Sequence, residues 1–255
     1  DMVAKLGFVT LRFDKRGVGE SGGDYNTTGM WDLVEDIMTI VDYLRNQPFV
    51  DPNKVILMGH SEGCMLAATA NAQRPVDGMI LLSGAAETLL EAITNQRELA
   101  IRELMNAKGI KGALFRMLKA DKKAEKQNEK LYRKIMEGNQ DTIRVNLMKL
   151  NAKWFREHYS HNVLEDLKKA NCPVLAITGS KDSQTDPEKV KDVPNLVKGE
   201  AAWYIIENMD HSLKEYDGPI SIVNAMKQYE KSEDQPIHQE LKSKVSEWLV
   251  NHYQH

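Results

Sequence analysis

The residue best suited to nucleophilic chemistry is Ser61, at the centre of the sequence Gly59-His60-Ser61-Glu62-Gly63. Gly-x-Ser-x-Gly alone is a weak signal, but an apolar run at 55–58 precedes it and a helix-forming stretch at 64–70 follows it. A strand, a sharp turn and a helix in this order hold a serine in strained backbone angles with its hydroxyl exposed. We expect the glycines two residues before and after Ser61 to be needed so that the strand and the helix can approach.

His211 and Asp182 are the residues expected to activate this serine. A serine hydroxyl is a poor nucleophile until a base takes its proton, and a histidine base needs a carboxylate to fix its tautomer. His211 follows an apolar run at 203–206, and Asp182 follows another at 174–178. All three residues therefore come after predicted strands, where open α/β sheets place their sites. The sequence predicts a Ser-His-Asp catalytic triad.

Other polar residues near these motifs are weaker candidates. Asp186 is a rival acid, but it lies farther from the end of the preceding strand than Asp182 does. The sharp turn should point the side chain of His60 away. The carboxylate of Glu62 could select against acidic substrates or simply face solvent. The remaining histidines lie in a long insertion or in and beyond the last helix: His158, His161, His238, His252 and His255.

The elements that must position these residues alternate between apolar runs and amphipathic helices. The runs at 7–13, 54–58, 79–82, 174–178 and 203–206 are nearly all apolar, which is typical of strands buried on both faces of a parallel sheet. Apolar residues spaced by three and four predict helices over 31–44 and 237–249. The alternation predicts an α/β fold: a mostly parallel sheet with helices on both faces.

One long segment breaks this alternation. Residues 86–171 contain no convincing strand, and their pattern predicts helices, including a strongly charged one at 119–137 and one that carries Ile143, Val145, Leu147 and Leu150. A connection of this length is too long for a simple crossover between strands. We expect a helical subdomain at 86–171 over a core made of residues 1–85 and 172–255.

Composition limits the class of protein and its partners. The chain has 255 residues, 42% hydrophobic and 28% charged, and a formal net charge of −3, so it does not call for a nucleic-acid or membrane partner. No apolar run approaches the roughly 18 residues of a membrane span. The scattered histidines predict no metal site, and an incomplete glycine pattern at 17–19 predicts no dinucleotide cofactor. The two cysteines, Cys64 and Cys172, favour a reducing, cytoplasmic compartment. The oligomeric state is not indicated.

Four motifs together resemble the α/β-hydrolase superfamily, in its esterase and serine-aminopeptidase-like branch. They are the segment 14–21 (DKRGVGES), the elbow at 59–63, the segment 173–182 (PVLAITGSKD) and Asp210-His211, in the family's order. The resemblance implies that the insertion is a cap, or lid, that shapes substrate access. It also implies that the backbone amide of Glu62 is one oxyanion-hole donor, while a His-Gly type loop after an upstream strand gives the other. Nothing before Gly7 can supply that loop, so the second donor is unassigned and N-terminal strands are expected to be missing from this sequence.

Two classes of function remain. The first is a serine hydrolase that cleaves a carboxylic ester of a small-molecule acyl substrate through an acyl-enzyme, without a cofactor. A peptidase, thioesterase or acyltransferase could use the same triad, and aminoacyl amides tested beside esters would identify a peptidase. The second is a binding or regulatory protein on a hydrolase scaffold, which only the missing oxyanion loop favours.

Overall fold

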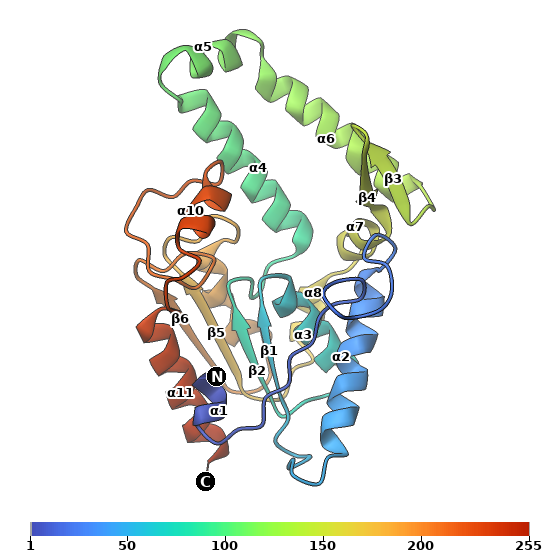
Figure 1. Cartoon of the computed structure of the whole chain (residues 1–255), viewed down its shortest axis with the longest axis vertical. Coiled ribbons are helices and arrows are strands. Elements are labelled where there is room, and N and C mark those ends of the chain that lie inside the picture. The colour runs from blue at the N-terminus through green and yellow to red at the C-terminus, as the bar shows by residue number, and fades with distance from the viewer. Residues whose placement is uncertain (1, 255) are drawn as a thin grey trace.

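The computed structural model describes residues 2–254 and is built around a four-stranded sheet (Figure 1). The strand order is β1-β2-β5-β6, and every neighbouring pair is parallel. The strands are β1 (Ile56–His60), β2 (Gly78–Leu82), β5 (Val174–Gly179) and β6 (Ala201–Ile206). Because all four strands run in one direction, their carboxyl ends meet at one edge of the sheet.

Helices surround this sheet and build the insertion. The core helices are α1 (Met2–Lys5), α2 (Met30–Arg45), α3 (Glu62–Gln73), α9 (Val193–Leu196), α10 (Ala225–Lys231) and α11 (Gln239–Tyr253), with the 3₁₀ helix η1 (Pro187–Asp192). The insertion contains α4 (Leu89–Asn106), α5 (Gly109–Met117), α6 (Ala120–Glu137), α7 (Ala152–Tyr159) and α8 (Val163–Leu167).

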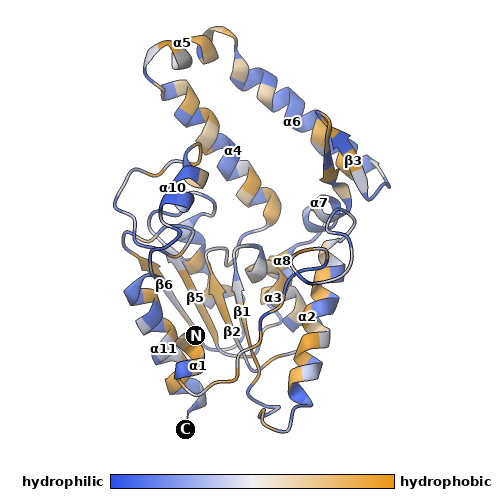
Figure 2. Ribbon diagram, viewed as in Figure 1, coloured by the Kyte–Doolittle hydropathy of each residue, from blue (hydrophilic) through white to orange (hydrophobic). Residues whose placement is uncertain are grey.

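Alternate side chains of the central strands enter two apolar layers. In β5, Val174 and Ala176 pack with residues of α2, α3 and α8, while Leu175 and Ile177 pack with α11 and α1 on the other face. This alternation is the period of two that a strand imposes, and burial on both faces explains why β5 has an unbroken apolar sequence (Figure 2). The predicted α/β fold, with a parallel sheet and helices on both faces, is confirmed.

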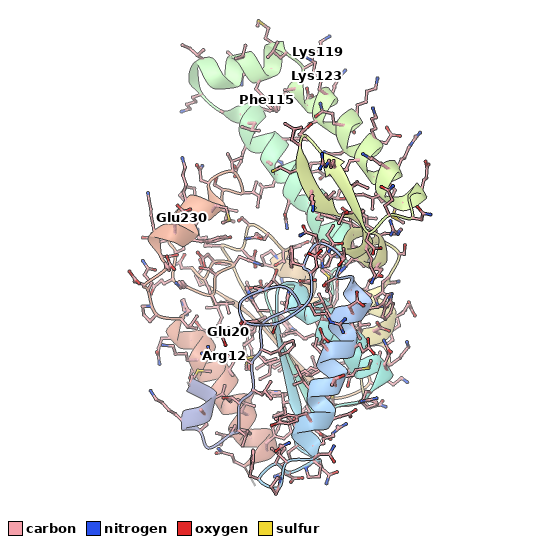
Figure 3. All side chains as sticks on the ribbon, turned by 45° about the vertical axis from the view of Figure 1, so that its right-hand side comes forward. Arg12, Glu20, Phe115, Lys119, Lys123 and Glu230 are labelled. Atoms are coloured by element: carbon pink, nitrogen blue, oxygen red, sulfur yellow. The ribbon has the colours of Figure 1, made fainter. Side chains whose placement is uncertain are left out.

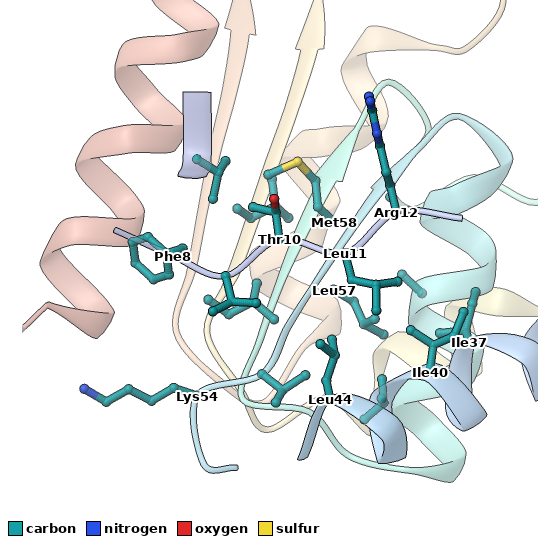
Figure 4. A pocket seen from close by; sticks show the side chains of 18 of the residues that line it. Phe8, Thr10, Leu11, Arg12, Ile37, Ile40, Leu44, Lys54, Leu57 and Met58 are labelled. Atoms are coloured by element: carbon teal, nitrogen blue, oxygen red, sulfur yellow. The ribbon is translucent and has the colours of Figure 1, made fainter. Parts of the chain in front are cut away.

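The apolar run at residues 7–13 does not form a strand, so that prediction was wrong. The segment is extended, but it belongs to neither sheet of residues 2–254. Its side chains form one wall of a cavity of about 660 Å³, and β1 and α2 form other walls (Figure 4). Apolar character predicts burial, whereas a strand also needs a neighbour within hydrogen-bonding distance, and the cavity separates this segment from β1. As a result β1 is an edge strand.

Residues 142–151 form a β-hairpin, which corrects the prediction of a helix there. Strand β3 (Thr142–Val145) pairs antiparallel with β4 (Met148–Asn151), with Ile143 opposite Leu150. The two turn residues, Asn146 and Leu147, both have positive φ, at 46° and 70°. A two-residue turn of this kind matches the twist of a hairpin. Ile143 is buried while Leu147 is 96% exposed, so the apolar residues here do not share one helical face.

The rest of the insertion is helical, and the predicted charged helix is α6. Helices α4, α5 and α6 form an arch beyond the carboxyl ends of the strands (Figure 1). The corner between α5 and α6, near Lys119 and Lys123, lies far from Arg12 (Figure 3). Helices α7 and α8 return to the core and pack on α2 and α3. Within residues 2–254, no helix combines the length and hydropathy that a bilayer crossing requires.

Glu87 is a buried carboxyl group between β2 and α4. It is 1% exposed, and its two oxygens accept hydrogen bonds from the side chain of Asn95 at 2.9 Å and from the backbone amide of Asp186 at 3.3 Å. Burial raises the pKa of Glu87 to about 7, although these two hydrogen bonds act to lower it. Glu87 thus connects α4 to the loop that carries Asp182.

We expect Glu87 to make the folded protein less stable as pH rises. The native state holds this proton more tightly than the unfolded state, so the loss begins near 4.5, the ordinary pKa of a glutamate side chain, and is complete above about 7. The full shift corresponds to about 3 kcal/mol at most. The glutamine in Glu87→Gln cannot ionise. The free energy of unfolding of this variant, relative to that of the wild type, should therefore rise between pH 5 and pH 8. Urea titrations across this range measure the difference, and parallel stability curves for the two proteins would contradict the expectation.

Candidate active site

Ser61 lies in the sharp turn between β1 and α3. Its backbone angles are φ 54° and ψ −121°, so the strained conformation expected from the sequence is present. Two hydrogen bonds fix the turn: the Ser61 amide donates to the Leu82 carbonyl at 2.9 Å, and the Cys64 amide donates to the Ser61 carbonyl at 2.9 Å. The side chain of Ser61 is thereby held at the carboxyl edge of the sheet and at the amino end of α3.

The two glycines of the elbow have different roles. A Cβ atom at Gly59 would collide with the carbonyl oxygen of Gly63, so a glycine is required at Gly59 as expected. A Cβ atom at Gly63 would meet nothing within 4 Å, so the expectation for this position was wrong. Gly63 faces the cavity beside β1, where a side chain has room.

His211 lies between Ser61 and Asp182. Its Nε2 is 3.1 Å from Oγ of Ser61, and its Nδ1 is 2.9 Å and 3.1 Å from the two carboxylate oxygens of Asp182. His211 and Asp182 are both buried. The three sequence candidates, which are separated by up to 150 residues, therefore form one hydrogen-bonded chain.

Asp182 is held as a carboxylate by donors on every side. Its Oδ1 accepts from the backbone amides of Gln184 at 2.8 Å and Thr185 at 3.0 Å, and its Oδ2 accepts from the Thr185 hydroxyl at 2.9 Å. Burial acts to raise its pKa, but the hydrogen bond and charge of His211 and the two backbone amides outweigh burial and lower the pKa below the ordinary value. A charged carboxylate at this position favours a proton on Nδ1 of His211, which leaves Nε2 free to accept one.

The loop of His211 is fixed by two neighbouring side chains. Asp210 is buried and accepts hydrogen bonds from the Ser212 amide at 2.9 Å and the Gln228 side chain at 2.7 Å. Nε2 of His60 lies 2.8 Å from the carbonyl oxygen of His211. The expectation that His60 points away from the site was therefore wrong. Desolvation by neighbouring atoms, followed by the charge of the nearby His211, lowers the pKa of His60, although the residue is exposed.

The rival candidates have structural partners elsewhere. Asp186 accepts a hydrogen bond from the Glu188 amide at 3.0 Å and caps η1. His161 is paired with Asp166 at 2.6 Å, and His238 caps α11. Within residues 2–254, no three His, Cys, Asp or Glu side chains gather in a way that could hold a metal ion.

Glu62 is the first residue of α3, and its side chain is 18% exposed. Its Oε2 is paired with Nζ of Lys15, and its Oε1 accepts a hydrogen bond from Nε1 of Trp154 at 2.6 Å. The alternative in which this side chain faces solvent is therefore wrong. Sequence reasoning missed Lys15 and Trp154, because no local pattern joins residues 47 and 92 positions away from Glu62.

The parallel sheet and the strand-turn-helix elbow together define the class of protein, which is an α/β hydrolase. Residues 1–216 match the family described as serine aminopeptidase, S33, so the chain belongs to that hydrolase family.

The chain is also similar to two curated proteins, and its fold is similar to that of a solved structure. The chain is 22% identical over 250 residues to esterase EstD of Thermotoga maritima, covering 97% of this chain and 55% of that protein. It is 24% identical over 206 residues to an uncharacterised 31.7 kDa protein of Escherichia coli, covering 76% and 69%. The fold superposes on a Paleococcus ferrophilus monoacylglycerol lipase with a TM-score of 0.55 at 18% identity, covering 94% and 82%.

Proposed function

We propose that the chain is a serine hydrolase that cleaves a carboxylic ester of a small-molecule acyl substrate. The observation that carries the proposal is the position of His211, with Nε2 at 3.1 Å from the Ser61 hydroxyl and Nδ1 at 2.9 Å from Asp182. This arrangement supplies a nucleophile, a base and a carboxylate that orients the base. The relationship to a protein named as an esterase supports the same reaction class.

The proposed reaction has two halves. Oγ of Ser61 attacks the ester carbonyl carbon while its proton passes to Nε2 of His211. The tetrahedral intermediate then expels the alcohol, which takes that proton, and leaves an acyl group on Ser61. In the second half a water molecule gives a proton to His211 and attacks the acyl carbon. The second tetrahedral intermediate then breaks its bond to Oγ of Ser61, which takes that proton back from His211, and the carboxylic acid leaves. No step requires a cofactor.

The backbone amide of Glu62 is the one oxyanion donor that we assign. As the first residue of α3, its N–H has no acceptor within the helix, and the amino end of a helix favours negative charge. The arch of α4, α5 and α6 beyond the carboxyl ends of the strands supports a lid role for residues 86–171. The lid would set which acyl groups and alcohols reach Ser61.

A fluorophosphonate probe tests the proposal before any substrate is identified. We expect the probe to label Ser61, as mapped by peptide mass spectrometry, and the label to disappear in His211→Ala. Labelling elsewhere in the chain, or equal labelling of the two proteins, would contradict an activated Ser61. Absence of labelling in the wild type would instead favour a binding protein on a hydrolase scaffold.

Amide hydrolysis is the second candidate, because the family is described as serine aminopeptidase. The same triad can open a peptide bond, in which case an amine leaves in place of the alcohol. Paired aminoacyl 4-nitroanilides and 4-nitrophenyl esters distinguish the two activities. A kcat/KM that is higher for the anilide than for the matched ester would place this chain among the peptidases.

A further inference from the structure

The carboxylate of Glu62 joins three segments that are far apart in the sequence. Lys15 comes from the loop after residues 7–13, Glu62 begins α3, and Trp154 lies on α7 of the insertion. The two oxygens of Glu62 are held from two directions, Oε2 by Lys15 and Oε1 by the indole N–H of Trp154 at 2.6 Å. Nε2 of His158 lies 3.4 Å from the same Oε1.

Trp154 is itself firmly placed. Its backbone amide donates to the side chain of Asn151 at 2.9 Å, which caps α7. The side-chain nitrogen Nδ2 of Asn151 in turn donates to the backbone carbonyls of Tyr25 and Thr28, each at 2.7 Å. The indole ring also packs against the buried ring of His158, with centroids 4.4 Å apart. The donor that reaches Glu62 therefore has little freedom to move.

Glu62 also carries the backbone amide that the proposed function assigns to the oxyanion. The amide and the tethered carboxylate belong to one residue, so the contacts of the side chain with Lys15 and Trp154 restrict the backbone movements that would turn this N–H away from the oxyanion. Lys15 also offsets the negative charge of this carboxylate, which belongs to the residue that follows Ser61. Catalytic donors are effective when they are aimed before the charge forms.

We propose that Trp154 is a positioning residue, which fixes the direction of the Glu62 amide through the Glu62 carboxylate. This inference rests on the proposed function. It makes acyl transfer depend on the placement of α7, so the insertion contributes to the chemistry as well as to substrate access. Trp154 acts through Glu62 and needs no contact with substrate.

The test uses Trp154→Phe, which keeps an aromatic ring beside His158 and removes the N–H donor together with one ring of the indole. Loss of a whole oxyanion donor costs about 100- to 1000-fold, so a misaimed donor should cost less, about 10-fold. We expect kcat on a 4-nitrophenyl ester to fall about 10-fold with KM within about twofold, and the rate of fluorophosphonate labelling at Ser61 to fall equally. Trp203→Phe is the matched control, because Trp203 lies on β6 with its ring near Lys191.

A double-mutant cycle makes the test specific. Glu62→Ala should show at least as large a fall, because it removes the carboxylate and with it the contacts to both Lys15 and Trp154. Trp154→Phe combined with Glu62→Ala should be no slower than Glu62→Ala alone, because the carboxylate that Trp154 holds is then already absent. Glu62→Gln keeps an oxygen acceptor for Trp154 and should lose less activity than Glu62→Ala. Multiplicative losses in the double variant, or a raised KM at unchanged kcat, would overturn the proposal.

The outcome also separates this inference from the proposed function. If wild-type Ser61 is labelled and Trp154→Phe is labelled at the same rate, the positioning role is wrong and the serine hydrolase proposal stands. If wild-type Ser61 is not labelled, the serine hydrolase proposal is wrong and the positioning role is rejected with it.

Discussion

Ser61→Ala should lower kcat on a carboxylic ester by about a millionfold. The small rate that remains would come from substrate binding and the Glu62 amide alone. The alanine lacks the Oγ that attacks the carbonyl carbon, so no acyl-enzyme can form. Initial rates with a 4-nitrophenyl ester measure the loss, and a burst of 4-nitrophenol equal to the enzyme concentration in the wild type would be absent in the variant.

Ser61→Ala should fold as stably as the wild type, so a loss of activity in this variant would report the chemistry. Alanine and serine have a similar energetic cost at φ 54°, so the melting temperature of Ser61→Ala should stay close to that of the wild type. A variant that melts normally and retains more than a few per cent of wild-type turnover would show that another group performs the reaction.

Asp182→Asn should lower kcat about 10⁴-fold. A carboxylate accepts the proton of Nδ1, whereas the NH₂ group of an asparagine can donate to Nδ1. That donation favours the tautomer of His211 with its proton on Nε2, and this nitrogen can then no longer accept the proton of Ser61. The loss should appear in kcat, because the substrate does not contact Asp182 in the proposed mechanism.

Asp186→Asn is the matched control for Asp182→Asn. Asp186 caps η1 through the Glu188 amide, and asparagine caps helices about as well as aspartate. We expect kcat of this variant to stay within about twofold of the wild type. A large loss in Asp186→Asn with little loss in Asp182→Asn would reverse the assignment of the acid.

The three site candidates were accessible from sequence because each follows an apolar run. Ser61 directly follows β1, while Asp182 and His211 lie in the loops after β5 and β6, and parallel strands bring their carboxyl ends to one edge. The same reasoning predicted the sheet and its two helical layers. The distances that join the three residues depend on side-chain placement, and their catalytic roles stay predictions until the variants are measured.

The predictions that were wrong concern segments whose structure or contacts are decided by residues far away in the sequence. Residues 7–13 have the composition of a strand, but a strand is defined by hydrogen bonds to a neighbour, which this segment lacks in residues 2–254. The apolar residues at 142–151 predict a helix where the structure has a hairpin, because a few apolar residues over so short a span fit either period. The contact between Glu62 and Trp154 joins positions 92 residues apart, and neither residue alone indicates it.

The packing beneath the elbow has a consequence for thiol chemistry. Sγ of Cys64 lies 3.2 Å from the carbonyl oxygen of Leu82 and 3.4 Å from that of Gly59, and burial raises the pKa of this thiol far above its ordinary value. Cys172 is only partly buried, and burial raises its pKa to about 11. Alkylation of Cys64 therefore requires the turn that carries Ser61 to open. The rate at which Cys64 is alkylated therefore reports how often the turn that carries Ser61 opens, and the rate at Cys172 serves as an internal reference.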